Sequence, residues 1–181
     1  MINQSSLIEK ARDLAYRAHA GQTRKYTGTP YITHPAQVAS LVSRQPWATD
    51  VEVAAAWLHD LLEDGDPSYI KEFRDNLPTE VIRLVEELTN PSKGSTAPRH
   101  QRKQQDRNHL QHVSVEAKRI KLIDRNLNIQ DIPEVGEEDF LDLYLQESAL
   151  LLQALQGAEP SWEAELSNTI RRRQERRNHH P

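Results

Sequence analysis

Several features are absent from this sequence, and each absence excludes a class of protein. The chain of 181 residues contains no cysteine, which excludes disulfide bonds and metal sites with thiolate ligands. It has no run of about eighteen apolar residues that could cross a membrane. The first residues, MINQSSLIEKARDL, lack the basic start and apolar core of a signal peptide. We therefore expect a single cytoplasmic domain over residues 1–181.

A net charge of −4 argues against a general nucleic-acid binder. Basic residues are nevertheless concentrated in three segments, GQTRKYTG, PRHQRKQQDR and the C-terminal RRRQERRNHHP. We expect the basic tail, about residues 168–181, to be a solvated and frayed helix end. Nucleic-acid binding through this tail is the less favoured alternative. The expected partner is a small molecule, with no membrane and no specific nucleic acid, and the sequence leaves the oligomeric state open.

Apolar residues recur at helical spacing through nearly the whole chain. The only possible strand pair lies within residues 22–33, which include Gly28 and Pro30. The sequence therefore predicts an all-α fold. The expected helices cover residues 5–20, a segment starting near Pro35, 50–64, 68–77, 79–89, 100–111, 114–130, a long segment from Phe140 to Leu155, and 161–176.

The segment WLHDLLEDGD, residues 57–66, places five ionisable side chains beside an apolar face. In one continuous helix His59 would lie next to Glu63, and Asp60 next to Asp64, because residues four apart share a face. Burying unpaired charge is costly. This face therefore either points into water or holds a positive group.

Two further residues favour a metal ion. His34 directly precedes a predicted helix, and Asp124 interrupts an apolar helical stripe in RIKLIDRNLNIQDI. With His59 and Asp60 they supply two imidazoles and two carboxylates, a set that suits Mn²⁺, Fe²⁺ or Zn²⁺. Each also has a plain structural interpretation: a capping His34, a solvent-facing His59–Asp60 pair, and an Asp124 paired with arginine or lysine.

The order H…HD…D resembles that of the HD superfamily of metal-dependent phosphohydrolases. The segments AHAGQTRKYTGTPYITHPAQVA, AAAWLHDLLED and RIKLIDRNLNIQDI resemble the hydrolase domain of RelA/SpoT-type alarmone enzymes, and most closely the free-standing small alarmone hydrolases. The resemblance covers about residues 5–167. It implies an HD-domain helical bundle that binds one Mn²⁺ and removes the 3′-pyrophosphate from (p)ppGpp, giving GDP or GTP and pyrophosphate.

The resemblance also implies roles for individual residues, carried over by position. The residues that match metal ligands are His34, His59, Asp60 and Asp124. The pair that matches the catalytic acids is Glu63 and Asp64; the pair at the phosphate end of the pocket is Arg24 and Lys25; and the nucleoside contacts are Tyr31, Asn128 and Tyr144. Tyr144 could equally be a core aromatic residue.

Two basic residues and two departures from the family pattern bear on the substrate. Arg102 and Lys103 either add to an electrostatic funnel for an anion or form an exposed helix end. Gly65 replaces the usual threonine, and Gln130 replaces a common arginine. The alternatives are an HD phosphohydrolase acting on another phosphorylated nucleotide, such as (p)ppApp, and a catalytically silent alarmone-binding sensor.

Overall fold

The structure, a computed structural model, describes residues 6–179 and divides into two compact units, Met1–Asn90 and Pro91–Pro181. Within the described residues the regular structure is helical, and the possible strand pair is a single antiparallel bridge between Thr23 and Pro30. The predicted all-α fold is therefore confirmed. Among these residues no helix is long and apolar enough to span a membrane. A single domain over 1–181 stays a prediction, and residues 180 and 181 of the tail lie outside the described part.

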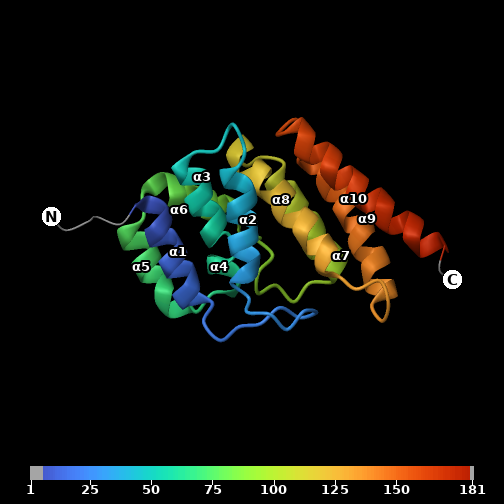
Figure 1. Cartoon of the computed structure of the whole chain (residues 1–181), viewed down its shortest axis with the longest axis horizontal. Helices are drawn as coiled ribbons and strands as arrows, with labels where there is room; N and C mark the ends of the chain where they lie inside the picture. The colour runs from blue at the N-terminus through green and yellow to red at the C-terminus, as the bar shows by residue number, and fades with distance from the viewer. Residues whose placement is uncertain (1–5, 180–181) are drawn as a thin grey trace. The chain divides into compact units, whose positions relative to one another are not determined.

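The first unit is built around helix α3. Its neighbours α1, α2 and α6 all pack against it (Figure 1). Three consecutive alanines, residues 54–56, are completely buried in α3, so the surrounding helices can approach closely on several sides. The helices of this unit are α1 (Leu7–Ala18), α2 (Thr33–Ser43), α3 (Asp50–Leu58), α4 (Leu61–Asp64), α5 (Ile70–Asn76) and α6 (Thr79–Leu88), with a 3₁₀ turn, η1, at Pro67–Tyr69.

The predicted single helix over residues 50–64 is wrong, because the chain leaves the helix at His59 and Asp60. His59 Nδ1 donates to the carbonyl of Ala56 at 2.8 Å. A continuing helix would offer that carbonyl to the backbone N–H of Asp60. Asp60 has φ −97° and ψ −3°, and α4 restarts after it with the N–H of Asp64 donating to the Asp60 carbonyl at 2.8 Å. The HD pair therefore sits at a helix break.

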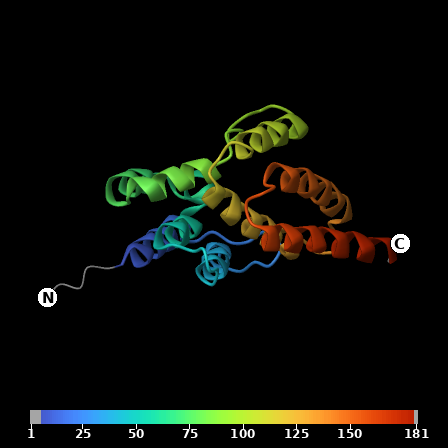
Figure 2. The same ribbon diagram turned by 90° about the horizontal axis from the view of Figure 1, so that it is seen from above.

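The second unit contains four long helices: α7 (Arg99–Leu110), α8 (Val115–Asp131), α9 (Glu138–Ala154) and α10 (Pro160–His179). Helix α8 packs against α9 and α10, and α7 packs against α9. Figure 2 shows α9, in orange, running beside α10, in red. Helix α8 is unusual because all six residues from 121 to 126 are buried, including Lys121, Asp124 and Arg125. Such a concentration of buried charge calls for partners.

The basic C-terminal segment continues α10 as far as His179, and most of its described side chains are exposed. Fraying of its end stays a prediction. All five of its arginines form ion pairs within the second unit. The pairs are Arg171 with Glu175, Arg172 with Glu165, both Arg173 and Arg176 with Glu134, and Arg177 with Asp142. These ion pairs neutralise much of the positive charge of the segment, so less of it is available to bind a nucleic acid.

Candidate functional site

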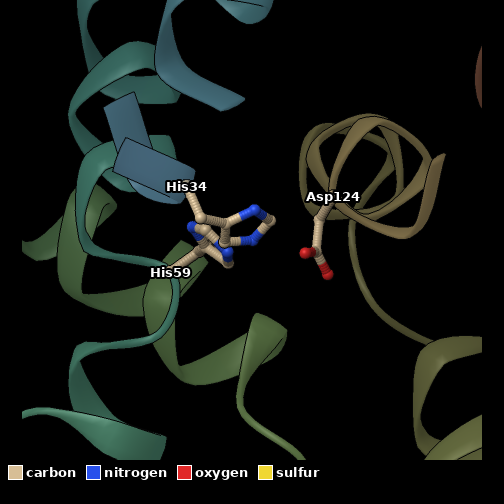
Figure 3. A group of neighbouring side chains, drawn as sticks. All are labelled: His34, His59 and Asp124. Carbon is tan, nitrogen blue, oxygen red and sulfur yellow. The ribbon is translucent and has the colours of Figure 1, made fainter. Parts of the chain in front are cut away.

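Two buried histidines of the first unit lie edge to face. His34 is in the first turn of α2 and His59 follows the last residue of α3, and each is only 2% exposed. Their ring centroids are 5.2 Å apart, and the two side chains are drawn together in Figure 3. Because His59 donates from Nδ1 to a carbonyl, its neutral form carries the free lone pair on Nε2. A fixed Nε2 acceptor is the arrangement found in metal-ligating histidines.

Asp60 meets both histidines through one oxygen. Its Oδ2 lies 3.2 Å from His59 Nε2 and 3.8 Å from His34 Nε2. The hydroxyl of Tyr31 donates to the same oxygen at 2.7 Å. Three atoms of types that bind metal ions thus lie close together in the first unit: the two histidine Nε2 atoms and Asp60 Oδ2. The hydrogen bond from Tyr31 orients the Asp60 carboxylate. The resemblance implied that Tyr31 contacts the nucleoside, whereas the structure places its hydroxyl on Asp60.

The loop between α1 and α2 holds Tyr31 in position. The ring of His19 stacks on that of Tyr31, with centroids 4.9 Å apart, and the guanidinium of Arg24 lies 5.6 Å from the Tyr31 centroid. The neighbouring Lys25 points to a different group, since its Nζ donates to the hydroxyl of Tyr26 at 3.0 Å. Arg24 therefore lies close to the Asp60 cluster, while Lys25 is exposed on the loop.

The two acids of the α4 segment are held differently. Glu63 accepts two hydrogen bonds from Asn90, one from the backbone N–H at 2.7 Å and one from Nδ2 at 3.1 Å. Asp64 is exposed, and its backbone carbonyl accepts from Gln22 Nε2 at 2.7 Å. The Glu63 carboxylate is therefore fixed in one orientation as an acceptor, whereas Asp64 is an exposed residue.

Asp124 of the second unit is buried on α8 with two partners. Lys121 Nζ lies 2.8 Å from its Oδ2, and Asn128 Nδ2 donates to its Oδ1 at 2.5 Å. The pairing with lysine considered from the sequence is therefore present. It does not prevent ligation, because a carboxylate has about four lone-pair sites and these contacts use two. Asn128, expected at the nucleoside, contacts Asp124 from one turn away.

A group of cations gathers next to Asp124 within the second unit. Burial lowers the pKa of Lys103, as do the charges of Arg125 and Lys121, against the opposing effect of Asp106 at 3.6 Å. Arg125 is buried, and its Nη1 donates to no described residue. Its guanidinium lies 4.4 Å from the centroid of the Tyr144 ring. Lys103, Lys121 and Arg125 thus place three positive charges close together in the second unit.

Tyr144 and Arg102 complete the predicted set. Burial raises the pKa of Tyr144, although Arg125 opposes the shift, so its hydroxyl stays protonated at neutral pH. Arg102 Nε donates to the Ala97 carbonyl at 3.1 Å, which stabilises the turn before α7. Arg102 thus has a local structural contact, and its neighbour Lys103 is the one that joins the cation group.

Sequence reasoning missed five residues that shape these clusters: His19, Gln22, Asn90, Lys121 and Arg125. Lys121 and Arg125 had a usable signal, since they lie three residues before Asp124 and immediately after it on a buried helix. Asn90 had none, because its contact with Glu63 spans 27 residues of sequence.

His34, His59 and Asp124 are all buried and all of types that bind borderline divalent ions, and the set is compatible with a divalent metal ion (Figure 3). Residues 11–162 match the protein family described as HD domain, and this range includes both histidines and Asp124. The chain belongs to the HD domain family. The predicted HD fold and the predicted membership of the superfamily are confirmed.

Several HD relatives match almost the full length of this chain. Human guanosine-3′,5′-bis(diphosphate) 3′-pyrophosphohydrolase MESH1 is 34% identical over 179 residues, covering 96% of this chain and 98% of that protein. The MESH1 of Drosophila melanogaster is 29% identical and covers 86% of this chain and 88% of its own length. A solved structure described as "A metazoan ortholog of SpoT hydrolyzes ppGpp and plays a role in starvation responses" has a TM-score of 0.82 and 26% identity. It covers 96% of this chain and 98% of its own.

Proposed function

We propose that this HD protein is a metal-dependent 3′-pyrophosphohydrolase of guanosine 3′,5′-bis(diphosphate), with Mn²⁺ as its ion. The observation that carries the proposal is the match, over nearly both full lengths, to a human enzyme named for this activity. Water attacks the 3′-diphosphate, the bond to the 3′-oxygen breaks, and the products are GDP and pyrophosphate. The substrate is a free nucleotide, which fits a cytoplasmic protein.

Four residues form the proposed ligand set: His34, His59, Asp60 and Asp124. The supporting features are the His59 tautomer, which leaves Nε2 as an acceptor, and the convergence of both Nε2 atoms on Asp60 Oδ2. Separations of 3.2 and 3.8 Å suit atoms that share one ion, since each ligand bond is about 2.0–2.2 Å. When bound, such an ion lowers the pKa of a coordinated water and neutralises phosphoryl oxygens.

Glu63 is the proposed base. Its carboxylate is already oriented by the two hydrogen bonds from Asn90, so it can accept a proton from the attacking water without first being ordered. Glu63 then passes that proton to the leaving 3′-oxygen. Asp64, the other acid of the pair, is solvent-exposed and is proposed to orient the attacking water.

Cations are proposed to bind phosphate in each unit, taken by itself. Arg24 supplies a guanidinium beside Tyr31 and Asp60. Lys103 and Arg125 supply the charges in the second unit, where Arg125 Nη1 is a buried donor with no described partner. A buried cation of this kind is costly unless an anion binds it. Tyr144 is the proposed aromatic contact for the base; its ring centroid lies 4.4 Å from the Arg125 guanidinium and 5.6 Å from the centroid of the Phe140 ring.

The deciding experiment measures pyrophosphate release from ppGpp and from ppApp by metal-stripped protein, with and without Mn²⁺. We expect Mn²⁺-dependent release from ppGpp that is abolished in His59→Asn and falls at least a hundredfold in Glu63→Gln. Asp66→Asn is the matched control, because Asp66 lies in the same segment but caps η1 by accepting from the N–H of Ser68.

Three outcomes would contradict the proposal. Release from ppApp alone would assign the other alarmone as substrate. Tight ppGpp binding without turnover would make the protein a sensor. No binding and no release, with Mn²⁺ bound, would move the search to other phosphorylated nucleotides.

A further inference from the structure

A hollow of about 360 Å³ lies within the second unit, where the end of α8 faces α10. None of its lining residues belongs to the proposed ligand, base or phosphate sets. It is lined by Gln130, Glu165, Thr169, Arg172, Arg173 and Arg176. The volume lies in the range of about 300–1,000 Å³ that is typical of small-molecule sites. Gln130, the departure from the family pattern, is exposed and contributes an amide to this hollow.

Two residues that line the hollow each carry a buried polar atom that makes no hydrogen bond to a described residue. Thr169 is only 5% exposed, and its Oγ1 makes no hydrogen bond to a described residue. A threonine in a helix commonly donates to the carbonyl four residues earlier, so this free hydroxyl is unusual. The Nε of Arg173 is likewise buried without a described partner. Buried unsatisfied donors are rare in folded proteins and indicate a missing acceptor.

The charge of the hollow is also incompletely balanced. Arg172 pairs with Glu165 at 2.9 Å. Arg173 and Arg176, however, share a single carboxylate, that of Glu134, at 3.2 and 3.1 Å. Three guanidinium groups therefore face two carboxylates, and one positive charge remains. Burial and the neighbouring Arg176 lower the pKa of Arg173, which indicates that its charge would gain from a further anion.

We propose that this hollow is a second binding site, specific for a phosphate-bearing anion and independent of the HD residues. The phosphoryl oxygens accept from Thr169 Oγ1 and Arg173 Nε, and the remaining donors of Arg176 face the same anion. Arginine suits this ligand, because its planar guanidinium group can make two parallel hydrogen bonds to one phosphate. The anion can be pyrophosphate or the phosphate end of a nucleotide, and the two share this chemistry.

The test is isothermal titration calorimetry of the full-length, metal-stripped protein with pyrophosphate and, separately, with GDP. Thr169→Val keeps the shape of the side chain and removes the hydroxyl, and Arg176→Gln removes a charge. We expect each change to raise the dissociation constant of the anion at the hollow about tenfold, while binding at any other site stays the same. This is the effect of losing one hydrogen bond to a charged group. Arg171→Gln is the control, because Arg171 lies on the same helix, pairs with Glu175 and does not line the hollow.

Each result bears on the proposal. Weaker binding in Thr169→Val and Arg176→Gln, with Arg171→Gln equal to wild type, supports it. Whether pyrophosphate or GDP binds more tightly then identifies the source of the phosphoryl group. Equal affinity in all four proteins, or no anion binding at all, overturns it. If Thr169→Val does not fold, Arg176→Gln still decides the question, because the Arg176 side chain is 65% exposed and its replacement is tolerable to the fold.

Discussion

The hydroxyl of Tyr31 allows a direct test of the proposed metal site, because two interpretations of this residue predict different results. The resemblance assigns Tyr31 to the nucleoside, whereas the structure shows its hydroxyl donating to Asp60 Oδ2 at 2.7 Å. Tyr31→Phe removes only that hydroxyl. The ring itself, stacked on His19 and covered by Arg24, is retained.

The expected size of the effect follows from what the hydroxyl does before and after an ion binds. A hydrogen bond to a charged group contributes about 1.5–3 kcal/mol. The hydroxyl already makes this bond in the metal-free geometry, so only part of its energy favours the ion-bound state. Groups that orient a metal ligand typically change affinity about 10–100-fold. We therefore expect Mn²⁺ affinity to fall about tenfold, or about 1.4 kcal/mol.

The assay is a calorimetric titration of metal-stripped protein with Mn²⁺, followed by steady-state kinetics of ppGpp hydrolysis at saturating Mn²⁺. Weaker Mn²⁺ binding with an unchanged KM is the expected result. Unchanged Mn²⁺ binding with a raised KM would refute the reasoning and return Tyr31 to the nucleoside. Tyr26→Phe is the control, because Tyr26 lies in the same loop and its hydroxyl contacts Lys25.

Three further predictions concern the acids, the end of α4 and the buried cations. Asn90→Ala removes the Nδ2 donor to Glu63 and keeps the backbone one, so we expect kcat to fall about tenfold with KM unchanged; a change confined to KM would contradict this. Gly65→Ala places a β-carbon 2.6 Å from the Leu61 carbonyl oxygen, so urea denaturation should show a loss of about 1–3 kcal/mol, and equal stability would argue against so close an approach. The pKa of Lys103 is lowered in the fold, so its charge opposes folding at neutral pH, and this penalty fades as pH rises from the lowered value toward the ordinary value of 10.5. Lys103→Met should therefore stabilise the protein at pH 7, and by a smaller amount at pH 10; a constant difference between the two would show that the charge is not responsible.

Helical spacing predicted much of the fold, and residue types selected the candidate residues of the site. The apolar period located most helices, because burial of one face decides where a helix forms. The choice of His34, His59, Asp60 and Asp124 rested on which side chains bind divalent ions, and the structure buries both histidines and Asp124. Their role as ligands stays a prediction.

The sequence could not predict where the HD segment leaves the helix. That break depends on competition for one carbonyl, that of Ala56, between the imidazole of His59 and the backbone N–H of Asp60. Helical propensity does not describe such a competition. The Asn90 contact with Glu63 could not be predicted for a different reason. No sequence pattern indicates which residue accepts a hydrogen bond from an asparagine in a loop.

Gln130 stands where relatives commonly have arginine, and the position of this residue in the fold changes how the difference is interpreted. From the sequence, the loss of an arginine weakened the case for a polyphosphate site. On α8, however, Gln130 is two residues beyond Asn128, about 200° around the helix, and it lines the hollow against α10. Lys121 contacts Asp124, and the charges of Lys121 and Arg125 act on Lys103; Gln130 takes part in neither interaction.

The acids of the proposed metal site already have neutralising or donating partners in each unit. Asp60 accepts from Tyr31, and Asp124 is paired with Lys121 and bound by Asn128. Removing an ion from such carboxylates does not leave a buried charge without a partner, which is the costly case. Under the proposed function, the fold and the ion would therefore be less tightly coupled than in small zinc domains, which unfold without metal. Each unit would present its proposed ligands before the ion arrives, so the ion and the substrate would exchange without unfolding of the helices that carry these residues.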